Sequence, residues 1–246
     1  MRVTVVLPAL NEEATVGSVV RAIKAQGPDE IIVVDADSHD CTAVEAANAG
    51  AVVKNWRDIL PEIPVRAGKG ESLWRSVAAV DGDVIVFADA DLRDVQPDLL
   101  SQLTAPFAND PVHLVKADYR RTLDGAPSGG GRVTELTAKP LLRMLFPEVA
   151  HINQPLAGEY AIRRDTARVL PFVGGFGVEA GLLIDVVKQY GPGAVAQAPL
   201  GPRVHRNKPL GELTSMADVV AATILSRAGI GEVEQRPPIN DYDVSR

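Results

Sequence analysis

The chain has 246 residues, 46% of them hydrophobic, and a formal net charge of −7 at pH 7. This length can bury a complete hydrophobic core, so we expect one globular α/β domain rather than two independent ones. A negative chain does not offer the basic footprint that nucleic acids require, so no nucleic-acid partner is expected. Small anionic substrates stay possible, because they need only a local cluster of positive charge.

Membrane and redox features are also limited by the sequence. No apolar run approaches the roughly 18 residues that span a bilayer, so no membrane partner is expected. The first residues show no leader pattern, and we therefore expect a cytoplasmic protein. The single cysteine, Cys41, excludes an internal disulfide and a metal site made only of thiolates, which agrees with a reducing compartment.

The first part of the chain alternates strands and helices. A Val-rich strand is predicted over residues 2–7, and the turn from Pro8 to Glu13 leads into a helix for which Asn11 is the expected N-cap. Further strands are predicted over residues 30–34 and at Val52-Val53. This alternation predicts an α/β fold with a mostly parallel, doubly wound central sheet flanked by helices.

Two aspartates follow the most apolar of these strands. The run Val84–Phe87 reads as a strand buried on both faces, and Asp89 and Asp91 come directly after it. Ligands of parallel α/β sheets gather beyond the carboxyl ends of the strands, where hard carboxylate oxygens suit a divalent cation that holds a diphosphate. The simpler interpretation is a strand-end turn with two solvated aspartates.

Two glycine-rich segments precede predicted helices in the second half. Gly129–Leu136 includes Arg132 and Thr134 at the start of a helix, where free backbone N–H groups can bind phosphate or carboxylate. Gly174–Glu179 repeats the pattern and places Glu179 in a first helical turn. The first segment is either an anion site or a flexible loop, and Glu179 either caps its helix or accepts hydrogen bonds from substrate hydroxyls.

The remaining elements complete the predicted domain. Strands are expected at Val112–Lys116 and Ala194–Ala198, and the last helix at Leu213–Leu225. The run Gly201–Lys208 is the strongest basic cluster. Residues 230–246 lack periodicity and are predicted to form a loosely ordered tail.

Several common chemistries have no motif in this sequence. It has no Walker-type loop, no Gly-x-Ser-x-Gly elbow and no His-Glu-x-x-His pair. The first turn, Pro8–Glu13, lacks the three-glycine fingerprint of a dinucleotide site, which argues against a nicotinamide enzyme. What is left is a metal–diphosphate site next to a second anion site.

These motifs carry a family resemblance. Three segments resemble the nucleotide-sugar half of GT-A glycosyltransferases: Val6–Glu13, Val33–Ser38 and Phe87–Asp91. Four others closely resemble the actinobacterial glucosyl-3-phosphoglycerate synthases: Pro61–Ser76, Gly129–Leu136, Gln154–Tyr160 and His205–Asn207. The resemblance implies a GT-A fold and retaining transfer of glucose from UDP-glucose or GDP-glucose to 3-phosphoglycerate. It also implies a Mg²⁺ or Mn²⁺ cofactor and a homodimer.

The resemblance implies one GT-A domain over residues 1–229, with a nucleotide-sugar half at 1–95 and an acceptor half at 96–229. It implies that the donor is bound by Pro8, Ala9, Leu10, Glu12, Ala36, Lys69, Asp89, Ala90, Asp91 and Glu179. It implies that the acceptor is bound by Gly131, Arg132, Thr134, Arg203 and Asn207. The implied metal ligands are Asp91 and His205, and the implied catalytic residues are Asp89, Asp91 and Glu179.

Alternatives stay open at the level of sequence. One alternative is mannosyl-3-phosphoglycerate synthesis from GDP-mannose, in which the transferred hexose is mannose instead of glucose. A single hydroxyl contact can decide between the two hexoses. A non-catalytic sugar-nucleotide-binding module is a second alternative. A nucleotidyltransferase is a third, although such enzymes usually begin with a Gly-rich basic loop and Pro8–Glu13 is neither.

Overall fold

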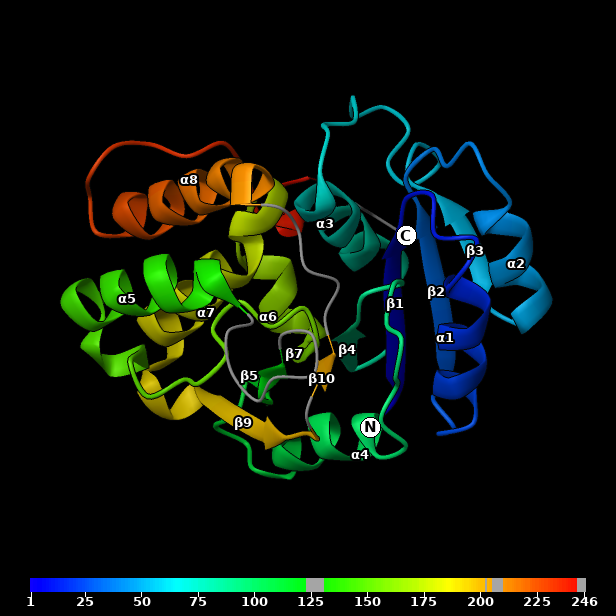
Figure 1. Ribbon diagram of the computed structural model, residues 1–246, viewed down its shortest axis with the longest axis horizontal. Helices are drawn as coiled ribbons and strands as arrows, with labels where there is room; N and C mark the ends of the chain where they lie inside the picture. Colours follow the sequence, from blue (N-terminus) through cyan, green and yellow to red (C-terminus); the bar gives the residue numbers. More distant parts are fainter. Residues whose placement is uncertain (123–130, 202, 205–209, 243–246) are drawn as a thin grey trace.

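The computed structural model describes residues 1–122, 131–201, 203–204 and 210–242. Within them a central seven-stranded sheet has the order β3-β2-β1-β4-β7-β5-β9 (Figure 1). Its strands are β1 Val3–Ala9, β2 Glu30–Asp35, β3 Val52–Asn55, β4 Val84–Phe87, β5 Leu114–Asp118, β7 Tyr160–Arg163 and β9 Val195–Pro199. The helices are α1 Val16–Lys24, α2 Thr42–Ala49, α3 Lys69–Ala79, α4 Leu99–Thr104, α5 Lys139–Leu145, α6 Arg164–Val169, α7 Val178–Tyr190 and α8 Leu210–Arg227.

The direction of the strands places one functional edge. β7 runs antiparallel to both β4 and β5, whereas the other neighbouring strands of this sheet pair in parallel. The carboxyl ends of β1, β2, β3 and β4 therefore meet the amino end of β7 at the same edge. The predicted α/β fold with a mostly parallel central sheet is confirmed.

Side chains from alternate positions of the strands pack into two apolar layers. On one face, Val5 and Leu7 of β1 pack with α1, α2 and α4. On the other, Val6 of β1 and Phe87 of β4 pack with α3, α6, α7 and α8. The sheet is buried on both faces, which explains why β4 has no polar position. No helix among the described residues is both long and apolar enough to cross a bilayer.

The turn after β1 differs from its predicted form. Helix α1 begins at Val16 and not directly after Asn11, so the predicted N-cap role of Asn11 is wrong. Asn11 instead adopts a left-handed conformation with φ 57°, and its side-chain oxygen accepts a hydrogen bond from the His39 backbone N–H at 2.9 Å. This residue thus ties the β1 turn to the loop after β2.

The closing part of the described chain is docked. Strand β11, Gln235–Arg236, pairs antiparallel with β8, Phe172–Val173. Ile239 is fully buried, and the Trp74 indole N–H donates to the Pro237 carbonyl at 2.8 Å. The prediction of a loosely ordered tail is therefore wrong for residues 235–242, because they carry their own buried anchors.

Candidate active site

A largely buried lysine joins two carboxylates at the functional edge of the sheet. Lys69 is the first residue of α3, Asp89 follows β4, and Glu179 lies in the first turn of α7. The Lys69 Nζ lies 2.6 Å from Asp89 Oδ1 and 2.8 Å from Glu179 Oε1. Three of the predicted site residues, distant in sequence, are thus in direct contact.

The electrostatics of this cluster keep Lys69 charged. Burial alone would lower the pKa of Lys69, but the charges of Asp89 and Glu179 more than offset it and raise that pKa well above its usual value. Tyr160, the first residue of β7, has its own pKa raised, chiefly by burial and then by the Glu179 charge. Its hydroxyl therefore stays neutral, and it has no hydrogen-bond partner among the described residues.

Glycines let the parts of this cluster approach closely. A Cβ at Gly158 would overlap with the Asp89 carboxylate, so the chain before β7 supports that side chain directly. A Cβ at Gly70 in α3 would overlap with the Val173 carbonyl. The amino end of α3 therefore packs backbone to backbone against the segment that leads into α7 and Glu179, which fixes the separation of Lys69 and Glu179.

Asp91 differs from Asp89 in its surroundings. Its side chain is exposed, and no hydrogen bond or ion pair to it is found among the described residues. Ala90, between the two aspartates, is buried, so the chain after β4 directs the Asp91 side chain toward solvent. An exposed carboxylate without a protein cation fits a divalent metal ion. The other predicted ligand, His205, lies outside the described residues, as does the predicted acceptor residue Asn207.

The predicted donor residues after β1 lie on the same edge. Pro8 and Ala9 end β1, and the Ala36 backbone N–H donates to the Ala9 carbonyl at 2.9 Å. Leu10 is about half exposed, with 54% of its surface accessible. The backbone N–H of Glu12 donates to Thr42 Oγ1 at 2.7 Å, which fixes the turn against α2.

The predicted acceptor segment begins a helix, as its sequence indicates. Gly131 has φ 74°, and its carbonyl accepts the Glu135 N–H at 3.0 Å. Thr134 is buried and starts a π-helical turn, Thr134–Ala138, that continues into α5. Arg132 directly follows Gly131 and lies in the first helical turn. The backbone of Arg203 is described in the short strand β10, Arg203–Val204. The roles of these residues in binding stay predictions.

A second polar group on this edge was not predicted from the sequence. Asp37 adopts a left-handed conformation with φ 63°, and its carboxylate accepts Arg57 Nε at 2.7 Å and Asn55 Nδ2 at 3.1 Å. The Arg57 hydrogen bond is the main cause that lowers the pKa of Asp37 to about 2. The signal that could have found this pair is the register, because Asn55 ends β3 directly opposite Asp35 at the end of β2.

The fold and this edge define the class of the protein. A mostly parallel sheet carries an Asp-x-Asp motif at the end of β4, as in the nucleotide-sugar half of a GT-A glycosyltransferase, and Lys69 lies beside it. In agreement, a model of the family described as glycosyl transferase family 2 matches residues 4–157.

Close relatives define the family more narrowly. A glucosyl-3-phosphoglycerate synthase of Mycolicibacterium smegmatis is 52% identical over 94% of this chain and 78% of its own length. The synthase of Petrotoga mobilis is 41% identical over 92% of this chain and 73% of its own length. The chain therefore belongs to glycosyl transferase family 2 and, within it, to the glucosyl-3-phosphoglycerate synthases.

Solved structures agree with this membership. The Mycobacterium tuberculosis glucosyl-3-phosphoglycerate synthase, crystallised with Mn²⁺, UDP-glucose and phosphoglyceric acid, matches with a TM-score of 0.91 and 45% identity. The match covers 98% of this chain and 90% of that one. The same enzyme with Mn²⁺, UDP and glucosyl-3-phosphoglycerate also matches with a TM-score of 0.91, at 44% identity over 98% of this chain and 91% of that one. The family and GT-A fold expected from the sequence are confirmed.

Proposed function

We propose that this chain transfers glucose from UDP-glucose to 3-phosphoglycerate, with a divalent cation as cofactor and retention of the anomeric configuration. The observation that carries the proposal is the Asp89–Lys69–Glu179 cluster beside the exposed Asp91, at the functional edge of a GT-A sheet. The relatives crystallised with donor, acceptor and product support the same reaction. The cluster in turn gives the residues separate tasks.

The donor half of the site lies within residues 1–95. Pro8, Ala9, Leu10 and Glu12 line the uridine pocket, and Ala36 faces the base. The Lys69 ammonium stays charged and partly enclosed, with 17% of its side chain exposed, so it can neutralise diphosphate charge at the point where the leaving group departs. Asp89, whose carboxylate lies against Gly158, holds that ammonium in place.

The exposed carboxylate of Asp91 is suited to a metal site. Asp91, together with His205, would hold Mg²⁺ or Mn²⁺, and the main-chain turn through the buried Ala90 fixes the direction of the Asp91 side chain. When bound, the cation supplies charge neutralisation for the departing diphosphate. The Oδ1 atom of Asp89 is ion-paired with Lys69, so we assign Asp89 to the lysine and Asp91 to the metal.

Glu179 is suited to hold the sugar rather than to attack it. Its carboxylate is almost fully buried and its Oε1 is ion-paired with Lys69, which reduces its strength as a nucleophile. The second oxygen of the carboxylate is the group proposed to accept a hydrogen bond from a glucose hydroxyl. Retention then follows from attack of the acceptor on the face that the diphosphate leaves.

The acceptor half lies within residues 96–229. Gly131 and the helical turn that follows it offer backbone N–H groups, and Arg132 adds a positive charge for the phosphate or carboxylate of 3-phosphoglycerate. Thr134 contributes a hydroxyl, and Arg203 and Asn207 complete the set. Fixing the acceptor near the sugar carbon supplies much of the rate by positioning alone.

Release of the nucleoside diphosphate tests this reaction. We would compare UDP-glucose, GDP-glucose and GDP-mannose, each with 3-phosphoglycerate and Mg²⁺, against a control without acceptor. The proposal expects acceptor-dependent release that is fastest with UDP-glucose. Preference for GDP-mannose would instead indicate mannosyl transfer. Release of pyrophosphate would indicate nucleotidyl transfer. If no donor gives release, a non-catalytic binding role would replace the proposed reaction.

We also propose a cytoplasmic homodimer, on the ground of the family resemblance. Light scattering of the purified chain gives the mass in solution directly. A monomer at micromolar concentration would contradict the dimer without affecting the proposed reaction. Fractionation of the native host would test the location, and a membrane or secreted fraction would contradict it.

A further inference from the structure

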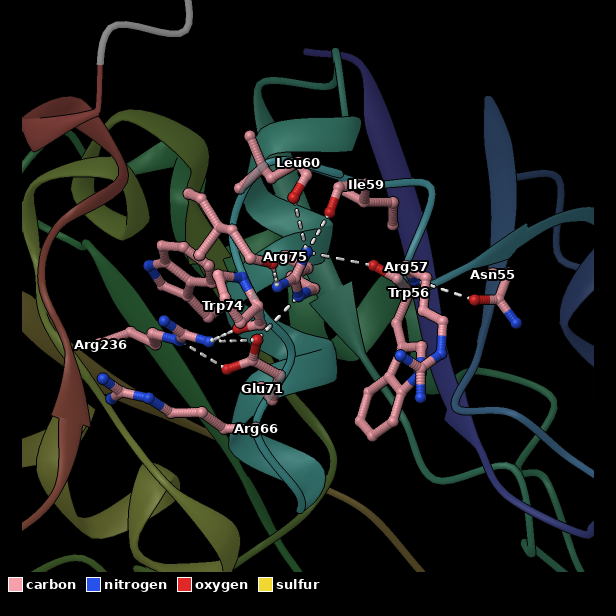
Figure 2. A network of polar contacts seen from close by, with 12 residues as sticks. Asn55, Trp56, Arg57, Ile59, Leu60, Arg66, Glu71, Trp74, Arg75 and Arg236 are labelled. Atoms are coloured by element: carbon pink, nitrogen blue, oxygen red, sulfur yellow. Dashed lines mark hydrogen bonds and ion pairs between the residues drawn. The ribbon is translucent and has the colours of Figure 1, made fainter.

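A buried carboxylate lies two residues beyond Lys69 in the same helix. Glu71 is 3% exposed, and its side chain accepts hydrogen bonds from two arginines, Arg75 and Arg236 (Figure 2). Arg75 Nε lies 2.7 Å from Glu71 Oε1, and Arg236 Nε lies 2.7 Å from Glu71 Oε2. A second nitrogen of Arg236 donates to Oε1 at 2.8 Å, so this contact is bidentate.

The two guanidinium groups also hold the loop that precedes α3. Arg75, which is fully buried, donates to backbone carbonyls of four residues: Trp56, Ile59, Leu60 and Ile63. Arg236 donates to the Pro64 carbonyl at 2.5 Å. The loop from Trp56 to Pro64 is thus held by two arginines that both pair with Glu71.

Arg236 belongs to a segment, residues 234–242, that also holds the chain leading into α7. The Gly174 N–H donates to the Glu234 carbonyl at 3.1 Å, and β11 pairs with β8. On the α3 side, the ring of Tyr242 packs edge-on against Trp74, with centroids 5.4 Å apart. The segment therefore contacts both α3, which carries Lys69, and the chain that leads into α7, which carries Glu179.

We propose that Arg236 is a positioning residue for the transfer reaction: through Glu71 it holds the start of α3 against β8 and so sets the position of Lys69 relative to Glu179. The inference rests on the proposed function of that cluster. Arg236 does not touch the cluster itself. Its effect passes through α3, which Gly70 already brings against the Val173 carbonyl of β8.

The role has a kinetic signature. The clamp is the contact of Arg236 with Glu71. Its loss lets α3 and the segment that leads into α7 separate at the donor site, so the KM for UDP-glucose rises and kcat falls, each by on the order of tenfold. The KM for 3-phosphoglycerate changes little, because Arg132 and Thr134 lie on other elements. A residue that acted on stability alone would lower the melting temperature and leave both KM values unchanged at temperatures where the protein is folded.

The test compares Arg236→Met and Arg236→Lys with Arg168→Met in the full chain. Arg168 is the matched control, because its Nε donates to Asn240 of the same segment at 2.9 Å without contacting Glu71. Arg236→Lys keeps the charge but not the bidentate fork, and is expected to recover only part of the activity. It also serves if Arg236→Met does not fold.

Two readouts decide the outcome. Kinetics with varied UDP-glucose and varied 3-phosphoglycerate give the split in KM, and hydrogen exchange reports the amides of residues 68–72 and 174–179. We expect faster exchange in both ranges for Arg236→Met and in neither for Arg168→Met. Unchanged exchange, or a KM for UDP-glucose equal to that of the control, would overturn the clamp. If the wild type shows no turnover, the proposed function fails and exchange alone still decides the clamp.

Discussion

Lys69 Nζ lies 2.8 Å from Glu179 Oε1, and these two residues lie in the first turns of different helices, α3 and α7. The ion pair joins two elements that are far apart in the sequence. Because Glu179 is almost fully buried, its charge depends on this lysine for compensation. The contact is thus both a structural link and part of the proposed donor site.

The first prediction concerns the stability of this link. Lys69→Met removes the cation and leaves a buried carboxylate uncompensated, so the free energy of unfolding should fall by about 2 kcal/mol. Adding Glu179→Gln should restore part of that loss, because the neutral amide no longer requires the cation. Urea unfolding of the two single variants and the double variant measures the coupling.

The matched control is Lys139→Met. Lys139 also pairs with a glutamate, Glu135 at 2.5 Å, but that pair is more exposed and lies within one helix. Its loss should cost less than about 0.5 kcal/mol. Equal costs for Lys69→Met and Lys139→Met would show that burial does not strengthen the Lys69 link.

A second prediction uses the support of Asp89 by Gly158. The Cβ of Gly158→Ala would overlap with the Asp89 carboxylate and displace it from Lys69. We expect kcat/KM to fall by on the order of tenfold or more. Gly193→Ala is the control, because a Cβ at Gly193 meets nothing within 4 Å. If both variants keep wild-type kcat/KM, the position of Asp89 is not important for the reaction.

A third prediction follows from the Asp37–Arg57 pair. The pKa of Asp37 is lowered from 3.8 to about 2, chiefly by the Arg57 hydrogen bond. Its ionised form therefore stabilises the fold above pH 3.8, and this contribution is lost as the pH falls from about 3.8 to about 2. Arg57 is mostly exposed, so the effect should weaken as salt is added.

The measurement is urea unfolding of wild type and Asp37→Asn at about pH 5 and about pH 2.5. The difference in unfolding free energy between them should be larger at the higher pH. Other carboxylates titrate in both proteins and cancel in the difference. The same difference at both pH values, or a larger one in acid, would contradict the assignment to Asp37.

Much of the fold could be predicted because its signals are local. Four consecutive apolar residues, Val84–Phe87, indicate a strand buried on both faces, and the end of such a strand marks the functional edge. The antiparallel direction of β7 could not be predicted in this way, because a short apolar strand reads alike in either direction. The docking of residues 235–242 left no periodic signal, since β11 has two residues and its anchors are single side chains.

The candidate site, like the fold, could be predicted from the sequence only in part. The sequence indicates Asp89 and Asp91 as a pair, but their different surroundings depend on where α3 begins. Glu71 resembles an ordinary acid in the first turn of a helix, and only the fold brings Arg236 to it. Contacts between distant segments are set by packing, which leaves little trace in either segment alone.

Identification of the product tests the proposed glucosyl transfer itself. Wild type and Asp91→Ala would each be incubated with Mn²⁺, 3-phosphoglycerate and UDP-glucose labelled with ¹³C in the sugar, and the product examined by NMR and mass spectrometry. We predict that the wild type forms glucosyl-3-phosphoglycerate with the anomeric configuration of the donor. We also predict that Asp91→Ala forms this product at least about 100-fold more slowly, and that the variant stays folded because the Asp91 side chain is exposed. A folded Asp91→Ala variant with wild-type rate, or a wild type that forms no glucosylated 3-phosphoglycerate, would contradict the proposed reaction.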